Sequence, residues 1–475
     1  MDDNSKIYKP QGKDYAKFII PSLIGAFLFL CPIPQAEGGF NIPLGIIVDW
    51  MTDIMDSVSF GIIAPDTMEL NFGLHYMIGL VCVTIAFVGM FLSTVLKLDF
   101  IMNKPLLKKA FYTPSPIYFA SKTLGFIFMW MLVLNIGPEQ VIASYTGDVM
   151  VELFAALVVI FIVLVPGIPL LTDFGLMEFI GIFIKKVVRT LFTLPGRASV
   201  DLVASWFGSS VASIIISRSQ HEKGFYTSRE AAVATTCFAI VSVPFSYIVA
   251  RTSGLADHFF LFYFIMTVAT LCLAMILPRI WPLRSVPDVY LEDVGKQFVE
   301  EEAPPNMSRF AFATQSASAR AQKMTAKDFK NSAVDTYIGI FFDLLPIILA
   351  WGTLAMMVNE LPIFGIKVFD YLSWPFVQFL QLMQVQVPSD VAAATVVGFI
   401  DMFIPAMMLR ASDVGLETRM ILGVLSVVQV IYMAEVGVLI LRSRIPLNFG
   451  KLLALFVMRT LIGLPIIVLL TKLII

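Results

Sequence analysis

The sequence is poor in charge. Only 14% of its 475 residues are Asp, Glu, Lys or Arg, whereas soluble domains are about a quarter charged. Instead, 58% of the residues are hydrophobic and the mean hydropathy is +0.84. Apolar runs of about 20 residues, the length that crosses a bilayer, recur from Phe18 to Ile475. This pattern excludes a soluble enzyme and predicts an all-α polytopic membrane protein within a lipid bilayer.

Residues that hold metals, nucleotides or nucleic acids are also scarce. The chain has three histidines and four cysteines, and no two cysteines have CxxC spacing. All four cysteines lie in apolar runs, so we expect packing residues and no metal site or disulfide. No GxxxxGK[ST] loop is present to bind ATP, and a net charge of −2 gives no basic field for nucleic acid. We therefore expect no cofactor and no nucleic-acid partner, with Na⁺ or H⁺ as the coupling ion of any transport.

The charges of the short loops predict how the chain is oriented. Lys and Arg resist translocation, so basic loops mark the cytoplasmic side. Residues 1–17 and 97–122 are rich in lysine, whereas residues 35–71 and 139–148 contain acidic residues and no Lys or Arg. We expect a bacterial inner-membrane (plasma membrane) protein with a cytoplasmic N-terminal segment, 1–17. A four-span scaffold, 18–171, follows, with spans near 18–34, 72–96, 117–135 and 150–171.

Residues 172–283 do not match the pattern of a series of simple transmembrane helices. Charges lie along one side of the apolar stretch 174–194, which predicts an amphipathic helix at the membrane interface. The stretch from Gly196 to Ser219 is rich in Gly, Ser and Ala. If it crossed the membrane, Arg218 and later basic residues would lie outside, so we predict a re-entrant helical hairpin that turns near Gly208. Spans near 230–253 and 258–281 complete this first repeat.

The same order of elements recurs over 366–475. Between the repeats we predict a cytoplasmic polar linker, 284–332, whose EEEAPP and SASARAQK segments are too polar to pack a core, and a connecting span within 333–365. A second amphipathic stretch, 366–386, precedes a second small-residue segment, Ser389–Arg410, with breakers at Gly398 and Pro405. An odd number of crossings separates the repeats, so they have opposite orientations.

The predicted fold therefore has about nine transmembrane helices, two re-entrant hairpins and two interfacial amphipathic helices in an inverted-topology repeat, with the C-terminus outside. Inverted repeats with broken helices are typical of secondary transporters, because the broken ends supply free backbone groups at the membrane midplane.

Two sets of motifs resemble a known family. GRASVDLVASWFGSS with GFYTSREAA, and GFIDMFIPAMM with QVIYMAEVGVLILRSRIPL, resemble the nucleoside-recognition (Gate-domain) membrane proteins of the YjiH-like branch. The order of elements is also similar to that of concentrative nucleoside transporters. The resemblance implies secondary-active, Na⁺- or H⁺-coupled transport of a small polar solute, nucleoside-like or amino-acid- or peptide-like, through a site between the hairpins.

The first hairpin supplies hydroxyl groups. Serines recur every four residues after Asp201, which places them along one helix face. We interpret Ser205, Ser209 and Ser210 as solute-binding candidates. Gly208 and Ser209 are ion-binding candidates, because Na⁺ favours hard oxygen ligands. The alternative is that these small residues only allow close helix packing.

Asp401 is the candidate in the second hairpin. A carboxylate at that depth is costly unless it is paired or protonated, so it is a candidate for binding solute and ion. Its alternative role is to cap the second half of the hairpin. Thr236 and Ser242 lie on the equivalent span of the first repeat, where Pro244 would break the helix. They are solute-binding candidates, unless their hydroxyl groups only bond to the preceding turn.

The last two spans carry a possible ion pair. Glu435 and Arg459 fall at one depth on antiparallel neighbours, which favours a structural pair. In the rival interpretation Glu435, together with Gln429 and Tyr432, faces the solute.

Two other functions are alternatives to transport. The chain could be a non-transporting membrane subunit of a signalling or assembly complex, and a homo-oligomer or a second membrane subunit is a possible partner. An intramembrane hydrolase built on Asp343 and Asp401 is disfavoured, because no HExxH motif occurs and no second histidine lies near an acid. We therefore expect no enzymatic activity.

Overall fold

The computed structural model describes residues 10–35, 39–63, 69–143, 146–208, 210–238, 241–296, 307–360 and 368–475. In these ranges the chain is helical apart from two small antiparallel sheets. Strands β1 (Ile33–Pro34) and β2 (Phe40–Asn41) form one sheet, and β3 (Ser59–Ile63) and β4 (Glu69–Gly73) form the other. The prediction of an all-α membrane protein is confirmed at this level.

The N-terminal part packs around α8, whose Leu153, Leu157 and Val158 are fully buried. Its helices are α1 (Gly12–Leu30), α2 (Pro43–Ser57), α3 (Leu74–Met90) with the π-helix η1 (Phe91–Val95), α4 (Asp99–Met102), α5 (Pro105–Phe111), α6 (Pro116–Leu134), α7 (Glu139–Ile142), α8 (Gly147–Leu164), the 3-10 turn η2 (Val165–Gly167) and α9 (Ile168–Thr172).

The next part of the chain contains the first repeat and the connecting helix. Its elements are α10 (Leu176–Leu191), α11 (Ala198–Phe207), α12 (Ser210–Glu222), α13 (Ser228–Cys237), α14 (Val243–Thr252), α15 (Phe259–Ile276), the turns η3 (Leu277–Arg279) and η4 (Leu283–Ser285), α16 (Arg309–Lys323), α17 (Ala326–Ile338), the π-helix η5 (Gly339–Leu344) and α18 (Leu345–Glu360).

The C-terminal part repeats the pattern of the first repeat. Its elements are α19 (Val368–Leu382), α20 (Ser389–Ala392), α21 (Ala394–Val397), α22 (Phe403–Ala411), α23 (Leu416–Val428), the π-helix η6 (Met433–Gly437), α24 (Val438–Leu441) and α25 (Phe449–Ile474).

Six helices of the described chain are long and apolar enough to cross a membrane. They are Leu74–Val95, Pro116–Leu134, Val149–Thr172, Phe259–Ser285, Ala326–Val358 and Phe449–Ile474. The other three predicted spans correspond to α1, which starts with charged residues, and to the interrupted pairs α13–α14 and α23–α24. Nine crossings therefore stay a prediction.

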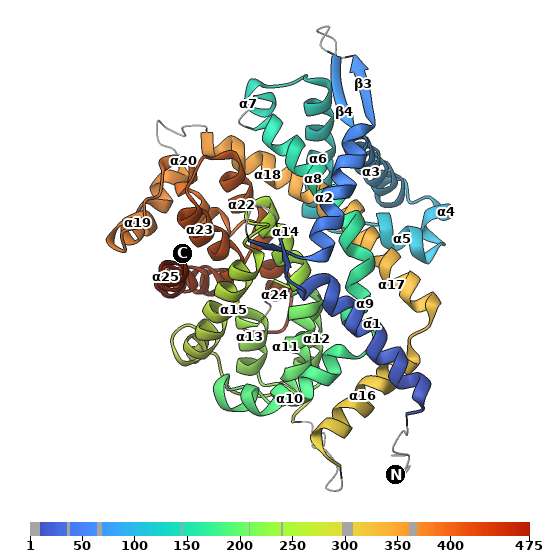
Figure 1. The fold of residues 1–475 in the computed structure, drawn as a ribbon, viewed down its shortest axis with the longest axis vertical. Coiled ribbons are helices and arrows are strands. Elements are labelled where there is room, and N and C mark those ends of the chain that lie inside the picture. The colour runs from blue at the N-terminus through green and yellow to red at the C-terminus, as the bar shows by residue number, and fades with distance from the viewer. Residues whose placement is uncertain are drawn as a thin grey trace.

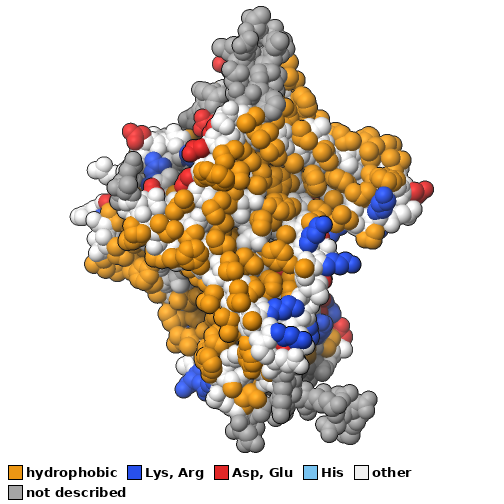
Figure 2. Space-filling view, turned by 45° about the vertical axis from the view of Figure 1, so that its right-hand side comes forward, with side chains coloured by type: hydrophobic (Ala, Val, Ile, Leu, Met, Phe, Trp, Pro, Cys, Tyr) orange, Lys and Arg blue, Asp and Glu red, His pale blue; other side chains and the backbone are white. Residues whose placement is uncertain are grey.

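Hydrophobic side chains cover much of the face shown in Figure 2, as a bilayer requires. On α3, for example, Val81, Ile85 and Val88 are exposed at helical spacing. In Figure 2 most Lys and Arg side chains lie in the lower half of the visible face. Figure 1 places α10 and α16 at this lower end, and α7 and the β3–β4 sheet, which belong to the segments predicted outside, at the upper end.

The prediction that residues 284–332 are too polar to pack is wrong for residues 309–323. Helix α16 packs against α1 and α10 (Figure 1), and its Ala313, Ala317 and Ala321 are fully buried. Phe18 of α1 and Phe179 of α10 contribute to the same contact. Alanines at every fourth residue form a narrow apolar stripe, which the polar residues between them hide in the average composition.

The two predicted amphipathic stretches do form helices. Residues 174–194 contain α10, and residues 366–386 contain α19. On α19, large apolar side chains are exposed, including Tyr371, Trp374 and Leu382. Such side chains suit the membrane interface, although the location of both helices at the interface stays a prediction.

Candidate functional site

Helices α11 and α12 form a helical hairpin, and α11 ends with Gly208 as its C-cap. The two helices pack against each other, and the Ser213 Oγ donates to the carbonyl oxygen of Asp201 at 3.3 Å. After α12 the Tyr226 hydroxyl donates to Asp201 Oδ2 at 2.5 Å, deep in the protein. The chain therefore enters and leaves this hairpin at the same end of it. At the turn, a Cβ on Gly208 would lie 2.7 Å from the Ala204 carbonyl oxygen, which excludes a side chain there.

The second repeat contains an equivalent unit made of α20, α21 and α22. Helix α22 packs against both short helices, and residues 398–402 form the turn between them. Beyond α22, Thr418 Oγ1 donates to the carbonyl oxygen of Gln386, just before α20, at 2.9 Å. This unit is also closed at its base. We call the two units the first hairpin and the second hairpin.

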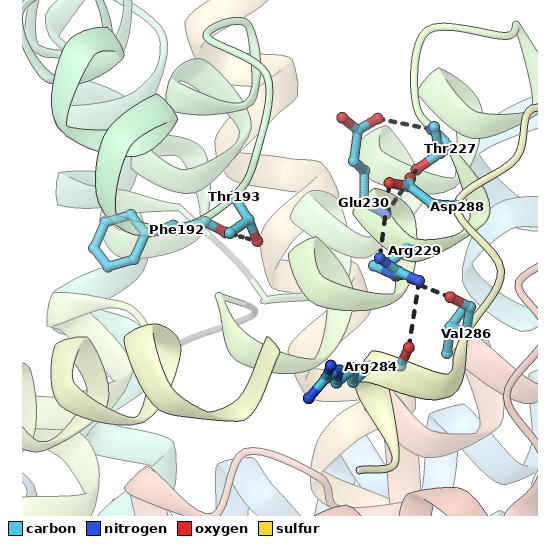
Figure 3. Close-up of polar contacts among 8 residues, drawn as sticks. All are labelled: Phe192, Thr193, Thr227, Arg229, Glu230, Arg284, Val286 and Asp288. Carbon is cyan, nitrogen blue, oxygen red and sulfur yellow. Dashed lines mark hydrogen bonds and ion pairs between the residues drawn. The ribbon is translucent and has the colours of Figure 1, made fainter. Parts of the chain in front are cut away.

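A polar cluster fixes the base of the first hairpin to the segment after α15 (Figure 3). Thr227 and Glu230 form a capping box at the start of α13, with bonds of 2.8 and 3.1 Å. The Thr227 hydroxyl also donates to Asp288 Oδ1 at 2.6 Å, and Arg229 Nε donates to the Val286 carbonyl oxygen at 2.9 Å. The cluster borders a polar cavity of about 550 Å³. These contacts hold the hairpin base in place.

Helix α25 has contacts near the base of each hairpin, at its two ends. Before its start, Arg444 pairs with Asp293 at 2.8 Å, in the segment that holds the base of the first hairpin. Near its end, Lys472 Nζ donates to the Gln384 carbonyl oxygen at 3.2 Å and lies 3.7 Å from Glu417, both at the base of the second hairpin. A helix of 26 residues is about 39 Å long. The two bases are therefore separated by roughly that length.

The turns of both hairpins line one cavity of about 860 Å³. Gly208 of the first hairpin and Asp401 of the second hairpin both contribute to its wall. Arg320 and Arg442 are exposed, whereas Asp401 is only 7% exposed, so the cavity runs from the surface into the interior. A stripe along α17, η5 and α18 forms another wall: Ser332, Thr336, Gly339, Ile340, Asp343, Leu344 and Ile347.

Asp343 lies in this stripe within the π-helix η5. Its side chain is 46% exposed and forms an ion pair with Lys122 of α6, which is only 2% exposed. The Lys122 Nζ also donates to Thr113 Oγ1 at 3.1 Å. Sequence reasoning used Lys122 only as a marker of orientation and did not find this pair. The signal that could have found it is an acid within an apolar span, since such a residue needs a partner.

Asp401 has the capping role that the sequence analysis gave as its alternative, and its binding of solute and ion stays a prediction. Its Oδ1 accepts a hydrogen bond from the backbone nitrogen of Phe403, the first residue of α22, at 2.8 Å. The carboxylate therefore caps that helix. It also faces the cavity, where its remaining lone pairs are available.

Other predicted solute-binding residues do not line this cavity in the part of the chain that is described. Ser205, Thr236, Ser242 and Tyr432 are buried. Thr236 Oγ1 donates to the Ala232 carbonyl oxygen at 2.6 Å, which is the back-bonding alternative. Ser209, as well as the side chains of Ser210 and Glu435, lie outside the described structure.

Gln429 lies behind the turn of the second hairpin. Its Nε2 donates to the Thr395 carbonyl oxygen at 2.8 Å and to Thr460 Oγ1 at 2.9 Å. A Cβ on Gly398 would lie 2.2 Å from Gln429 Oε1, so only glycine allows this close approach. Gln429 therefore joins the second hairpin to α25.

Arg459 of α25 joins the broken helices of the two repeats. It is fully buried, and its Nε and Nη2 donate to the Val428 carbonyl oxygen at 2.9 and 2.7 Å. Its Nη1 donates to the Thr236 carbonyl oxygen at 2.8 Å. These carbonyls lie at the C-terminal ends of α23 and α13, where a positive charge suits the helix dipole. The predicted pair with Glu435 is untested, because the Glu435 side chain is not described.

Comparison with known proteins gives a family match. The model of the family described as "Gate: Nucleoside recognition" matches residues 120–256, which include the first hairpin and the broken helix α13–α14. An uncharacterised protein of Alkalihalophilus pseudofirmus is 39% identical over 454 residues, which cover 95% of this chain and 93% of that protein. That similarity extends over almost the whole chain and so covers more than the match to the Gate model. The chain belongs to the nucleoside-recognition, or Gate-domain, family of membrane proteins.

Proposed function

We propose that the protein is a secondary-active transporter of a small polar solute. The observation that carries the proposal is the single cavity of about 860 Å³ that reaches from exposed residues to the turns of both hairpins. Hairpin turns end helices within the protein, so they offer backbone groups that no helix uses. Hairpins that open at opposite ends let each one act as the gate of one side.

The cavity contains polar groups suited to a solute and to a coupling ion. Asp401 and Gly208 line its inner end. A carboxylate with about four lone-pair positions, one of them used by Phe403, can hold Na⁺ or accept H⁺. We assign the coupling ion to this inner end, and Ser209, which lies outside the described residues, stays a candidate from the sequence.

The contacts of α25 favour movement of the two repeats together. Arg459 binds the ends of α13 and α23, and Gln429 joins the second hairpin to the same helix. If both hairpins move together against α6 and α17–α18, so that the cavity becomes accessible from the other side of the membrane, these bonds stay intact. This is an elevator-like or hairpin-gated motion in a plasma-membrane protein whose N-terminus is cytoplasmic and whose C-terminus is outside.

Uptake into proteoliposomes tests the proposal. Purified protein is reconstituted, and accumulation of labelled nucleosides, amino acids and dipeptides is measured with and without gradients of Na⁺ and H⁺. We expect accumulation of at least one solute that depends on one gradient. Asp401→Asn should lower it at least tenfold, whereas Asp413→Asn, in the exposed turn after α22, should not change it.

Absence of uptake for every solute, with folded protein and sealed vesicles, would contradict transport. It would favour the alternative of a non-transporting subunit of a larger membrane complex.

A further inference from the structure

Five Asp and Arg side chains of the described residues line the cavity of about 860 Å³. They are Asp173, Arg320, Asp343, Asp401 and Arg442. Their partners within the protein show which charges are already compensated. A charged side chain that has no charged partner in the protein can pair with a group of opposite charge on a ligand.

Three of the five side chains are compensated by the protein. Arg320 lies 3.9 Å from Asp173 and 3.7 Å from Glu178. Asp343 is paired with Lys122. These ion pairs leave Asp401 and Arg442.

The two remaining side chains have charges of opposite sign, and each can form more hydrogen bonds than the described structure shows for it. Arg442 Nη2 donates to the Ser115 hydroxyl at 3.3 Å, and no ion pair of Arg442 occurs among the side chains that the structure describes. Asp401 accepts from one backbone N–H and likewise has no basic partner among the described side chains. A guanidinium group has five N–H donors, enough to bind a carboxylate with two parallel bonds.

We propose that the solute is a zwitterion of amino-acid or short-peptide size, with its ammonium group at Asp401 and its carboxylate at Arg442. This inference rests on the proposed transport function and names its substrate class. A neutral nucleoside would leave both charges without partners. The cavity volume is in the range of ligand sites and leaves room for two residues of a peptide.

Ligand-induced thermal stabilisation of the purified protein tests the substrate class. The probes are Ala-Ala, Ala-Ala amide, N-acetyl-Ala-Ala and uridine, each titrated in nanodiscs. Ala-Ala should stabilise the protein, and the two blocked peptides should bind on the order of tenfold or more weakly, because each lacks one charge. Stabilisation by uridine without stabilisation by Ala-Ala would overturn the inference, as would equal affinity for all three peptides.

Paired variants test which residue binds each charged group of the solute. Arg442→Gln should weaken Ala-Ala at least about tenfold but should leave the affinity for Ala-Ala amide unchanged, since that probe has no carboxylate. Asp401→Asn should weaken Ala-Ala similarly and leave N-acetyl-Ala-Ala unchanged. Arg444→Gln is the matched control for Arg442, because Arg444 pairs with Asp293 away from the cavity. If Arg444→Gln has the same effect as Arg442→Gln, the assignment is wrong.

The proteoliposome assay separates this inference from the proposed function. Uridine uptake without uptake of any amino acid or peptide would support transport and overturn the zwitterion. Absence of all uptake, together with binding of Ala-Ala as described, would overturn transport and support the zwitterion site.

Discussion

The two hairpins have the same architecture but different chemistry. The first hairpin consists of helices of 10 and 13 residues that meet at Gly208. The second hairpin has helices of 4, 4 and 9 residues and carries Asp401 in a longer turn. Gly208 presents backbone to the shared cavity, whereas Asp401 presents a carboxylate. The two units therefore share a helical hairpin, and single residues decide which groups each turn presents to the cavity.

The largest expected effect concerns the orientation of the hairpins. In a variant without the four native cysteines, Arg218→Cys of the first hairpin should react with a membrane-impermeant maleimide only from the cytoplasmic side. Arg410→Cys of the second hairpin should react only from outside. Labelling in right-side-out and inside-out vesicles measures this all-or-none difference. Reaction of both positions from one side would mean that the repeats are not inverted.

The next largest effect concerns the hydrogen bonds by which Arg459 connects the two repeats. Arg459→Met should lower the free energy of unfolding by about 3–5 kcal/mol, because the Val428 and Thr236 carbonyl oxygens lose a buried, charged donor. Denaturant unfolding in detergent measures it, and Arg444→Met serves as the control at an exposed position. Equal losses in the two variants would show that the helix ends do not depend on Arg459.

Arg459 also allows a test of the predicted pair with Glu435. We expect Glu435→Gln and Arg459→Gln to lower thermal stability, and the double variant to lose less than the sum. Strict additivity of the two losses would show that these side chains do not interact.

The hydrogen bonds at the bases of the two hairpins should contribute different amounts to the free energy of unfolding. Tyr226→Phe removes the 2.5 Å bond to the buried Asp201 and should cost about 2 kcal/mol of unfolding free energy. Thr418→Val removes one bond to a carbonyl oxygen and should cost about 1 kcal/mol. Thermal unfolding of both variants compares the two values. A larger loss for Thr418→Val would reverse the proposed difference between the hairpins.

The smallest effect concerns the exposed pair near the first hairpin. The hydrogen bond from Arg444 lowers the pKa of the Asp293 carboxyl below its ordinary value. The pair therefore adds stability above the ordinary pKa of Asp, and this contribution is lost as the pH falls through the lowered pKa. The difference in melting temperature between wild type and Arg444→Gln should be small at pH 7 and should vanish in acid. A difference that grows in acid would contradict this assignment.

Much of the helical pattern could be predicted from the sequence. The apolar runs, the two amphipathic helices and the breaks near Gly208 and Gly398 all correspond to features of the structure. Pro244 correctly indicated an interruption, since α14 begins at Val243. Each of these depends on residues close together in the chain, and local composition reveals such features.

The partners of buried charges could not be predicted in the same way. Arg459 was predicted to pair with Glu435 of the preceding span, which stays a prediction, and its described bonds reach the ends of helices 31 and 223 residues away. Lys122 lies far along the chain from Asp343, and its pairing depends on how α6 packs against the π-helix η5. Helix α16 was missed for a similar reason, because its alanine stripe is informative only when α1 and α10 are present to cover it.

Hydropathy and helix breakers are local properties, so they were enough to identify this chain as a helical membrane protein with two interrupted segments. The tertiary contacts, in contrast, establish which charges are paired and which two of the five charges that line the cavity have no charged partner among the described side chains, because a side chain's electrostatic partner depends on helices that meet across the whole fold.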